Sequence, residues 1–252
     1  AAGREPEILA PAAGHGGHES SVPVTAVAAF AECPRNYYLS NFLGAPSAAA
    51  VWLDEEDGPE PGGRGADEPD AGEFGRQVHA LLAGEAVPEA GIEARNLAGA
   101  FAQTPIGARA ARAGRVEREF DFVLAVEEVV LRGQIDLWFE EAGELVVVDY
   151  KTDRLEDGRR ERLDRYALQV RLYALALERY LGRRPDLGLL HLLRTGESIE
   201  VDLTGPAIDR AVGVLRDLKR AQTEWRFPPR EGARCERCRF RRRECQSEPA
   251  PG

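Results

Sequence analysis

Hydrophobic residues recur with helical spacing in the first part of the chain, after an irregular start. Four stretches follow this pattern: residues 25–31, 34–43, 73–82 and 92–113. In the third stretch, Phe74, Val78 and Leu82 lie on one side of the predicted helix. The fourth stretch is rich in Ala, and we expect Pro105 to interrupt it because Pro removes a backbone hydrogen bond.

The pattern then changes to that of strands. Three strand-like runs joined by short polar turns occupy residues 116–126, 129–140 and 144–151. A helix, two strands and a final helix are then predicted over residues 160–181, 187–193, 198–203 and 206–224. Pro206 stands in the first turn of the last helix, where Pro is favoured. This order predicts an α/β domain with a mixed central sheet flanked by helices.

The stretches without periodicity set the expected domain limits. We expect a linker over residues 1–21, one domain over residues 22–246 and a tail over residues 247–252. Within the domain, we expect residues 45–72 to form an acidic disordered loop. The chain begins with Ala1 and contains no Met, so we expect a piece of a larger protein. It has neither a signal sequence nor a long apolar run, so a soluble, cytoplasmic protein is expected.

The formal net charge of −10 argues against nucleic-acid binding, because phosphates favour basic surfaces. The charge is unevenly spread, however, since residues 226–246 are rich in Arg. The expected DNA-contacting residues of this segment are Arg239, Arg241, Arg242 and Arg243. A solvated arginine-rich tail is the alternative, and charge alone leaves both interpretations open.

The main candidate for chemistry is a pair of carboxylates on adjacent strands, Asp136 and Asp149. Residues two apart in a strand share a face, so Asp149 and Lys151 point the same way, while Tyr150 points into the other layer. Two such carboxylates repel each other unless a cation lies between them. Oxygen ligands suit Mg²⁺ or Mn²⁺, which polarise a phosphodiester and lower the pKa of a bound water.

Lys151 would supply a compact positive charge to the same site. The basic residues are nearly all Arg, with Lys only at positions 151 and 219, which indicates a need for an ammonium group here. Asp149 and Lys151 are expected at a strand end, outside the core. One apolar face is expected on the neighbouring strand, formed by Leu131, Ile135, Leu137 and Phe139. The alternative for Asp149 and Lys151 is a surface ion pair, which is common on strands.

Two helical pairs extend the candidate site. Gly75 lies one turn before His79, so the Gly would leave room for close approach and the His would be a third metal ligand. Gln169 and Tyr173 are also one turn apart and could reach either a substrate phosphate or Lys151. Taken alone, His79 is an ordinary helix histidine and Tyr173 a core residue in an apolar stripe.

Together these residues resemble the RecB-like branch of the PD-(D/E)XK nuclease superfamily, over roughly residues 23–245. The resemblance implies a restriction-endonuclease-like core. The metal ligands that it implies are His79, Asp136, Asp149 and the backbone carbonyl of Tyr150. The catalytic residues that it implies are Lys151, Asp149 and Asp136, supported by Gln169 and Tyr173. Glu117 and Glu119, on the preceding strand, are further candidates for a nearby carboxylate.

The four cysteines carry a second resemblance. Cys33 stands alone near the start, whereas Cys235, Cys238 and Cys245 cluster in the Arg-rich segment. This arrangement resembles the iron–sulfur staple of AddB-type nucleases and of CRISPR-associated RecB-like nucleases. It implies a 4Fe-4S cluster that joins the N- and C-terminal segments. A structural Zn²⁺ with four thiolate ligands is the alternative, and disulfides are not expected in a cytosolic protein.

The resemblance implies a Mg²⁺- or Mn²⁺-dependent deoxyribonuclease, the nuclease domain of a DNA double-strand-break repair helicase–nuclease of the AddAB/RecBCD or UvrD/Rep type. Its partners would be DNA, expected to be single-stranded, and a helicase domain in the same chain or in a partner protein. No Gly-rich phosphate loop followed by Lys and Ser or Thr occurs, so the motor would lie elsewhere.

Four alternatives remain: a free-standing single-strand exonuclease, a CRISPR-adaptation nuclease, a non-catalytic scaffold that binds DNA ends, and a zinc-stapled interaction module. The scaffold is disfavoured because the decay of a nuclease site would remove at least one of its key side chains. His79, Asp136, Asp149 and Lys151 are all present.

Overall fold

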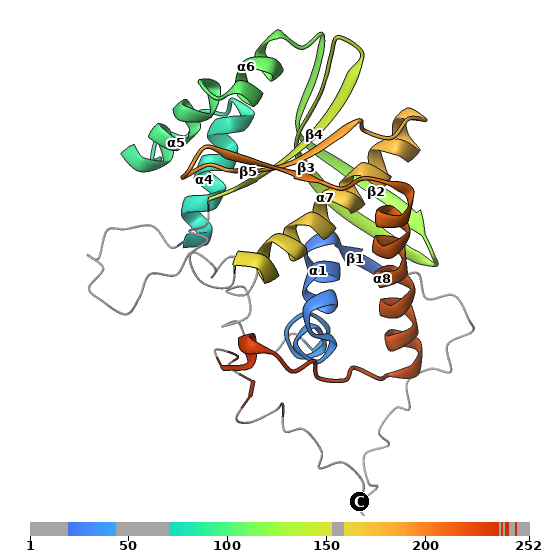
Figure 1. Cartoon of the computed structure of the whole chain (residues 1–252). Coiled ribbons are helices and arrows are strands. Elements are labelled where there is room, and N and C mark those ends of the chain that lie inside the picture. Colours follow the sequence, from blue (N-terminus) through green and yellow to red (C-terminus); the bar gives the residue numbers. More distant parts are fainter. Residues whose placement is uncertain are drawn as a thin grey trace, which may run out of the picture.

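A computed structural model describes residues 20–43, 71–152, 159–236, 238, 240, 241 and 245 (Figure 1). Its helices are α1 (Val24–Glu32), α2 (Pro34–Tyr37), the π-helix η1 (Tyr38–Phe42), α4 (Ala71–Ala83), α5 (Ile92–Ala102), α6 (Pro105–Arg112), α7 (Arg159–Leu181), α8 (Gly205–Glu224) and the 3-10 helix η3 (Ala233–Glu236). Its strands are β1 (Ser20–Pro23), β2 (Arg115–Val126), β3 (Val129–Glu141), β4 (Glu144–Lys151), β5 (Leu187–Leu192) and β6 (Glu197–Val201).

Every helix and strand predicted from the hydrophobic pattern is present, within two residues at each end. The break predicted at Pro105 separates α5 from α6, because Pro105 begins α6. The short elements β1 and η3 were not predicted. β1 takes up Ser20 and Ser21 at the end of the expected linker, and α4 begins at Ala71, inside the expected acidic loop. Residues 1–19, 45–70 and 247–252 of the expected linker, loop and tail lie outside the described residues.

The strands form one mixed sheet in the order β1-β3-β4-β5-β6, with β2 paired to β3. β3 is the centre of this arrangement. It pairs along its length with β2 on one side, and on the other side first with β1 and then with β4. The β1–β3 and β4–β5 pairs are parallel and the remaining pairs are antiparallel, which confirms the predicted mixed sheet.

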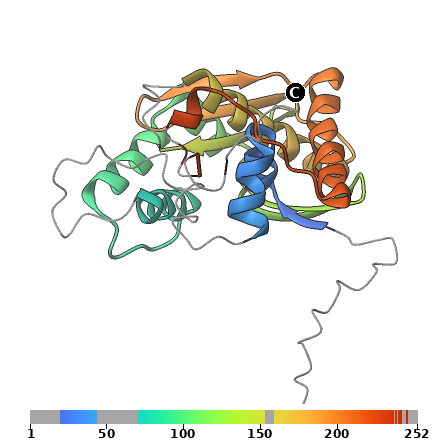
Figure 2. The same cartoon turned by 90° about the horizontal axis from the view of Figure 1, so that it is seen from below.

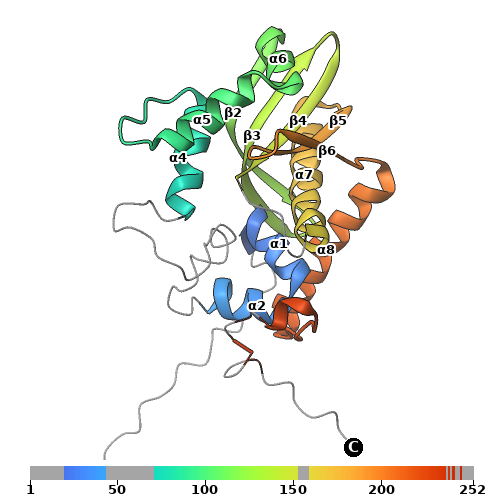
Figure 3. The same ribbon diagram turned by 60° about the vertical axis from the view of Figure 1, so that its left-hand side comes forward.

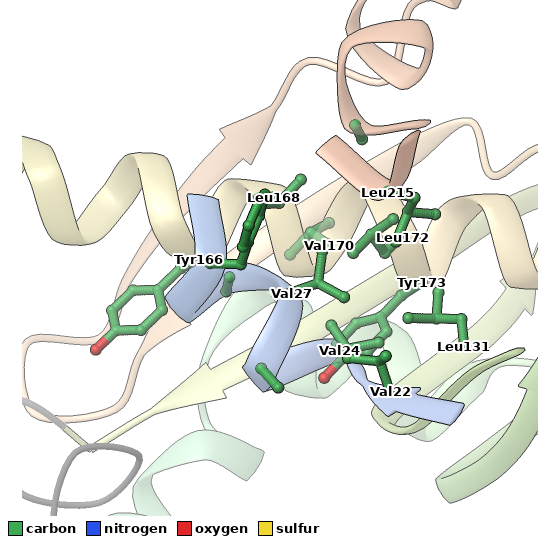
Figure 4. Close-up of a cluster of buried hydrophobic side chains, with 14 of the residues drawn as sticks. Val22, Val24, Val27, Leu131, Tyr166, Leu168, Val170, Leu172, Tyr173 and Leu215 are labelled. Carbon is green, nitrogen blue, oxygen red and sulfur yellow. The ribbon is translucent and has the colours of Figure 1, made fainter. Parts of the chain in front are cut away.

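Helices cover both faces of the sheet. The helices α4, α5 and α6 lie against one face, and α1, α7 and α8 lie against the other (Figures 1 and 3). Each face has its own hydrophobic cluster. Val78 and Phe101 belong to the cluster under α4–α6, and Val27, Leu172 and Leu215 belong to the cluster under α1, α7 and α8 (Figure 4). No helix in the described part of the chain is both long and apolar enough to span a membrane.

The side chains of β3 change layers at Asp136. Leu131 and Ile135 pack in the cluster under α1, α7 and α8, but Leu137 packs in the opposite cluster, under α4–α6. Residues two apart share a face in a regular strand, so the strand twists between these positions. The expected single apolar face of β3 is therefore wrong beyond Asp136. β2 bends at the matching point, where Glu119 has a left-handed φ of 47° and is missing from the ladder opposite Asp136.

The described parts of the two chain ends lie together. After α8 the chain runs past α1, and η3 comes to lie beside α2 (Figures 2 and 3). Arg230 connects the segments directly: its backbone N–H donates to the sulfur of Cys33 over 3.5 Å, and its guanidinium donates to the carbonyl of Ala31.

Candidate active site and cysteine cluster

The candidate site lies where β3 and β4 separate. Their antiparallel pairing ends at Leu137 and Val148, one position before Asp136 and Asp149 would face each other. Beyond this point the Oδ2 atom of Asp136 accepts a hydrogen bond of 2.6 Å from the backbone N–H of Tyr150. Asp136 and Asp149 thus lie on adjacent strands at a gap that the ladder leaves open.

Helix α4 brings His79 to this gap. Its Nδ1 atom lies 3.4 Å from Oδ1 of Asp136 and 3.6 Å from Oε1 of Glu119. One ligand atom from each of these three side chains lies within 4.8 Å of the other two. A Cβ at Gly75 would lie 3.7 Å from the Oγ1 atom of Thr152, an ordinary contact distance. No described part of the protein therefore approaches Gly75 so closely that a Cβ would be excluded.

Glu119 joins the site because of the bend in β2. Its Oε1 atom is buried and has no hydrogen-bond partner among the described residues. A left-handed φ is strained for a residue with a side chain, and such strain collects at functional sites. Glu117 and Glu119 were equal candidates from the sequence, and only the bend separates them.

On the opposite side of the gap, Asp149 holds Lys151. Nζ of Lys151 lies 2.9 Å from Oδ2 of Asp149 and donates a 3.0 Å hydrogen bond to Oε1 of Gln169. The pairing of Asp149 with Lys151 on one face was predicted. Their expected position outside the core is wrong for Asp149, which is 1% exposed, because α7 covers this end of the sheet. The side chain of Lys151 remains 17% exposed.

The charges in the gap depend on one another. Burial raises the pKa of Asp149 to about 6, against the positive charge of Lys151. Burial also opposes protonation of His79, but the carboxylates of Asp136 and Glu119 outweigh it and raise the pKa of His79 to about 10. Burial works against ionisation of Asp136 too, yet the charge of His79 keeps its pKa below the ordinary value. The gap therefore favours positive charge.

The residues present fit a divalent cation. Two carboxylates and an imidazole converge, and the buried Glu119 oxygen lacks a donor among the described residues. Asp149 is outside the group of three but borders the same gap. Within a strand, the N–H and C=O of one residue point to the same side. Since the N–H of Tyr150 points to Asp136, its carbonyl is also directed toward β3.

Tyr173 is buried among hydrophobic residues, and its ring packs edge-on against Phe122 with centroids 6.0 Å apart. Burial and the negative charge of Asp149 raise its pKa. Tyr173 thus lies in the core, as the apolar stripe indicated, and also lies close enough to Asp149 to be affected by its charge.

The four cysteines gather around one cavity of about 500 Å³ between α2, η1 and the C-terminal segment. Cys33 belongs to this group although it is far away in sequence. Burial raises the pKa of Cys245, and the other three thiols add to the shift. In the described part of the chain, no three cysteine sulfurs lie within 4.8 Å of one another.

The predicted arginine patch is only partly visible. Arg241 is exposed and its backbone N–H donates to the carbonyl of Cys238. Arg239, Arg242 and Arg243 lie outside the described residues.

Comparisons with known proteins agree with this geometry. Residues 21–246 match the model of the PD-(D/E)XK nuclease superfamily. An ATP-dependent helicase/nuclease subunit from Desulforudis audaxviator is 42% identical over 122 residues, which are 42% of this chain and 10% of that protein. The corresponding protein of Clostridium acetobutylicum is 33% identical over 118 residues, which are 40% of this chain and 9% of that protein. The chain thus spans about a tenth of the length of these curated relatives.

A crystal structure from Eubacterium rectale, described as a candidate exonuclease, has the same fold. The two superpose with a TM-score of 0.53 at 11% sequence identity, covering 92% of this chain and 91% of that one. The family match covers nearly the whole chain, and the structure has the mixed α/β fold that the resemblance implied. This chain therefore belongs to the PD-(D/E)XK nuclease superfamily.

Proposed function

We propose that this chain is a Mg²⁺- or Mn²⁺-dependent deoxyribonuclease. The observation that carries the proposal is the convergence of His79, Glu119 and Asp136 within 4.8 Å, beside the buried pair of Asp149 and Lys151. A nuclease needs a site for a divalent cation and a separate positive charge near the attacked phosphate. The gap between β3 and β4 holds groups suited to both tasks.

Each side chain then has a distinct role. The groups that would hold the cation are His79, Glu119, Asp136, Asp149 and the carbonyl of Tyr150. When bound, the cation would polarise the phosphodiester and lower the pKa of a water molecule. Lys151 would stabilise negative charge on the attacked phosphate, since Asp149 and Gln169 hold its ammonium in place. Tyr173 would support Asp149 from the core.

The experiment is cleavage of end-labelled single-stranded and double-stranded DNA by the whole chain, with Mg²⁺, Mn²⁺ or EDTA. We expect cleavage with either cation and none with EDTA. Asp136→Asn keeps the acceptor for the Tyr150 N–H but removes the charge, so cleavage should fall by ~10²-fold or more in protein that circular dichroism shows to be folded. Wild-type protein that cleaves neither DNA with any cation would overturn the proposal.

The role of Glu119 has a matched control in Glu117, two residues earlier on β2. We expect Glu119→Gln to weaken Mn²⁺ binding, measured by calorimetry, by on the order of 10-fold or more, while Glu117→Gln leaves it unchanged. Equal effects of the two variants would remove Glu119 from the site.

The likeness to ATP-dependent helicase/nuclease proteins supports a role as the nuclease part of a DNA-repair helicase–nuclease, acting in the cytoplasm with a motor in the same protein or a partner. A free-standing single-strand exonuclease is the second candidate, supported by the similarity to the Eubacterium rectale structure over nearly the whole chain. Degradation that requires ATP and an added motor protein favours the first candidate, and rapid ATP-independent degradation favours the second.

For the cysteines we propose a 4Fe-4S cluster. Zn²⁺ binds thiolates at ~2.3 Å in a tetrahedron, which puts the sulfurs ~3.8 Å apart. No three sulfurs of the described cysteines lie within 4.8 Å of one another, a wider spacing than such a site has, which supports a larger group. Anaerobic purification should give brown protein with iron and labile sulfide. Stoichiometric zinc without iron would contradict the cluster and support a structural Zn²⁺ instead.

We also propose that the exposed Arg241 and its neighbours Arg239, Arg242 and Arg243 contact the DNA backbone. Replacing Arg241, Arg242 and Arg243 by Gln should weaken binding of single-stranded DNA. It should also reduce the log–log salt slope by up to ~0.7 per lost phosphate contact. An unchanged slope would leave these residues as a solvated surface.

A further inference from the structure

Tyr166 on α7 contacts two cations with different roles. Nζ of Lys151 lies 4.6 Å from the centroid of its ring. The guanidinium carbon of Arg165 lies 4.9 Å from the same centroid, and Nη2 of Arg165 donates to the phenolic oxygen over 3.2 Å. The face of an aromatic ring attracts a cation. Figure 4 shows the ring of Tyr166 at one end of the hydrophobic cluster, with its hydroxyl directed away from the other labelled side chains.

The ring of Tyr166 is one of three described groups that contact the Lys151 ammonium. Tyr166 and Gln169 are three residues apart on α7 and therefore share a face of the helix. Gln169 accepts a hydrogen bond from Nζ of Lys151, Asp149 lies 2.9 Å from it, and Tyr166 lies against it. A lysine side chain is long and loses considerable rotamer freedom when it is fixed, so several contacts are needed to hold it in one place.

Arg165 continues the contacts toward the cysteines. Its side chain is only 8% exposed, and Nη1 lies 3.7 Å from Oε2 of Glu32. Glu32 is the last residue of α1, and Cys33 follows it directly. A second cavity, of about 330 Å³, is lined by both members of this ion pair and by Cys33, Cys235 and Cys238. A buried charge pair contributes little net stability when solvation is counted, so its position calls for another explanation.

We infer that Tyr166 is a positioning residue for Lys151, and that Arg165 and Glu32 make this position depend on the cysteine cluster. The inference rests on the proposed nuclease function. When the four cysteines are held by a bound group, the end of α1 is fixed and Glu32 restrains Arg165. The guanidinium of Arg165, 4.9 Å from the ring centroid of Tyr166, restrains this ring, and the ring in turn restrains Lys151. Loss of the bound group releases Glu32 and lets Lys151 leave its place beside Asp149.

The first test separates positioning from general stability. Tyr166→Leu removes the ring, Tyr166→Phe keeps it, and Tyr180→Leu is the matched control, an exposed tyrosine on the same helix. For Tyr166→Leu we expect kcat for DNA cleavage to fall on the order of 10-fold with KM unchanged. Tyr166→Phe should retain most of the wild-type kcat, and Tyr180→Leu all of it. A wild-type kcat for Tyr166→Leu, or an effect on KM alone, would overturn the inference.

The second test follows Lys151 without using cleavage. The chain has only two lysines, so amine acylation read by mass spectrometry compares Lys151 with Lys219 as an internal reference. Tyr166→Leu should raise the acylation rate of Lys151 relative to Lys219 several-fold, and Tyr180→Leu should not. If the wild type cleaves no DNA but the acylation changes as expected, the nuclease proposal fails and the positioning stands. If the wild type cleaves DNA and the acylation ratio is unchanged, the positioning role is wrong.

The third test concerns the link to the cysteines. Glu32→Gln and Cys33→Ser should each lower kcat and raise the acylation rate of Lys151 relative to Lys219. The double variant should be no worse than Cys33→Ser alone in either measurement, because both act through the same contacts. Losses that multiply would overturn the link through Glu32. If Cys33→Ser does not fold, Glu32→Gln and Tyr166→Leu are compared singly and together in its place. Losses of kcat that multiply in this double variant would likewise overturn the link through Glu32.

Discussion

Single residues in the gap differ in what surrounds them. Asp149 is buried and faces Lys151, whereas Lys151 retains access to solvent, which its proposed contact with a phosphate requires. The planar guanidinium of Arg is larger than an ammonium and donates in a fixed fork. Among the described residues, Lys151 meets a carboxylate, an amide and an aromatic face, and these groups fit a compact cation.

We therefore predict that Lys151→Arg lowers the single-turnover rate of Mg²⁺-dependent cleavage by ~10²-fold or more, although the charge is kept. Lys219→Arg on α8 is the control, since it makes the same exchange away from the site. Near-normal cleavage by Lys151→Arg would show that a general positive charge is sufficient.

His191 on β5 is a buried residue outside the active site. Its Nδ1 atom lies 2.9 Å from Oγ of Ser198, Nε2 has no partner among the described residues, and its ring packs against Phe101. Burial lowers its pKa to about 4. The unfolded chain, with a His pKa of ~6.5, binds the proton first as the pH falls. The stability linked to His191 is therefore complete above pH ~6.5 and is lost as the pH falls toward 4.

We predict that His191→Phe flattens the pH dependence of the free energy of unfolding over this window. The full shift corresponds to ~3 kcal/mol, and allowing for partial screening we expect a difference of ~1–2 kcal/mol. Urea denaturation of both proteins at pH 7 and pH 4.5 measures it. Parallel pH profiles for the two proteins would mean that other groups cause the acid sensitivity.

Among the elements, the β2–β3 pair determines the shape of the site. Because this pair twists, the odd-numbered side chains of β3 pack in one hydrophobic cluster before Asp136 and in the other cluster after it. Gly133, just before it, lies where β2 and α1 approach closely. A Cβ at Gly133 would lie 2.9 Å from the ring of Phe122 and from Cγ2 of Val24.

Gly133→Ala should consequently lower the free energy of unfolding by ~1–3 kcal/mol, because the added carbon overpacks this contact. Gly213→Ala inside α8 is the matched control, since nothing lies within 4 Å of its Cβ position. There Ala should raise the stability by ~0.5–1 kcal/mol, because Gly is unfavourable within a helix. The two variants are compared by thermal unfolding, and a stabilising Gly133→Ala would contradict the packing described here.

At the scale of the whole molecule, the four cysteines come from segments that are far apart in the sequence and line one cavity. Cys33 lies at the end of α1, and the other three cysteines follow α8, so every described strand except β1 and most described helices lie between these positions. Binding energy at such a site is shared with folding. The described ends also meet through the contacts of Arg230 with Ala31 and Cys33, and of Gln222 with Tyr37.

Cys33→Ser and Cys238→Ser should thus give the same result: loss of the bound metal, earlier proteolysis near both ends, and weaker DNA binding. Metal analysis of the anaerobically purified variants, with limited proteolysis, measures this. If Cys33→Ser keeps full metal content while Cys238→Ser loses it, then Cys33 is not a ligand. A solitary core thiol would cause only a small packing loss when replaced.

The sequence by itself determined the elements and the family. Helices and strands followed from local periodicity, since a helix and a strand expose their side chains at different repeats. The shared face of Asp149 and Lys151 needed only the two-residue repeat of a strand. The PD-(D/E)XK motif needed only residue types in order. Pro105 marked the break between two helices through a missing backbone donor.

The tertiary structure decided what lies between elements. Only the bend in β2 distinguishes Glu119 from Glu117, and only the cover of α7 places Asp149 in the core. The contact of Tyr166 with Lys151 likewise depends on how α7 crosses β4. These features arise from strand twist and helix packing, which combine the side chains of many distant residues. A local pattern contains the repeat of each element but not the direction in which one element meets another.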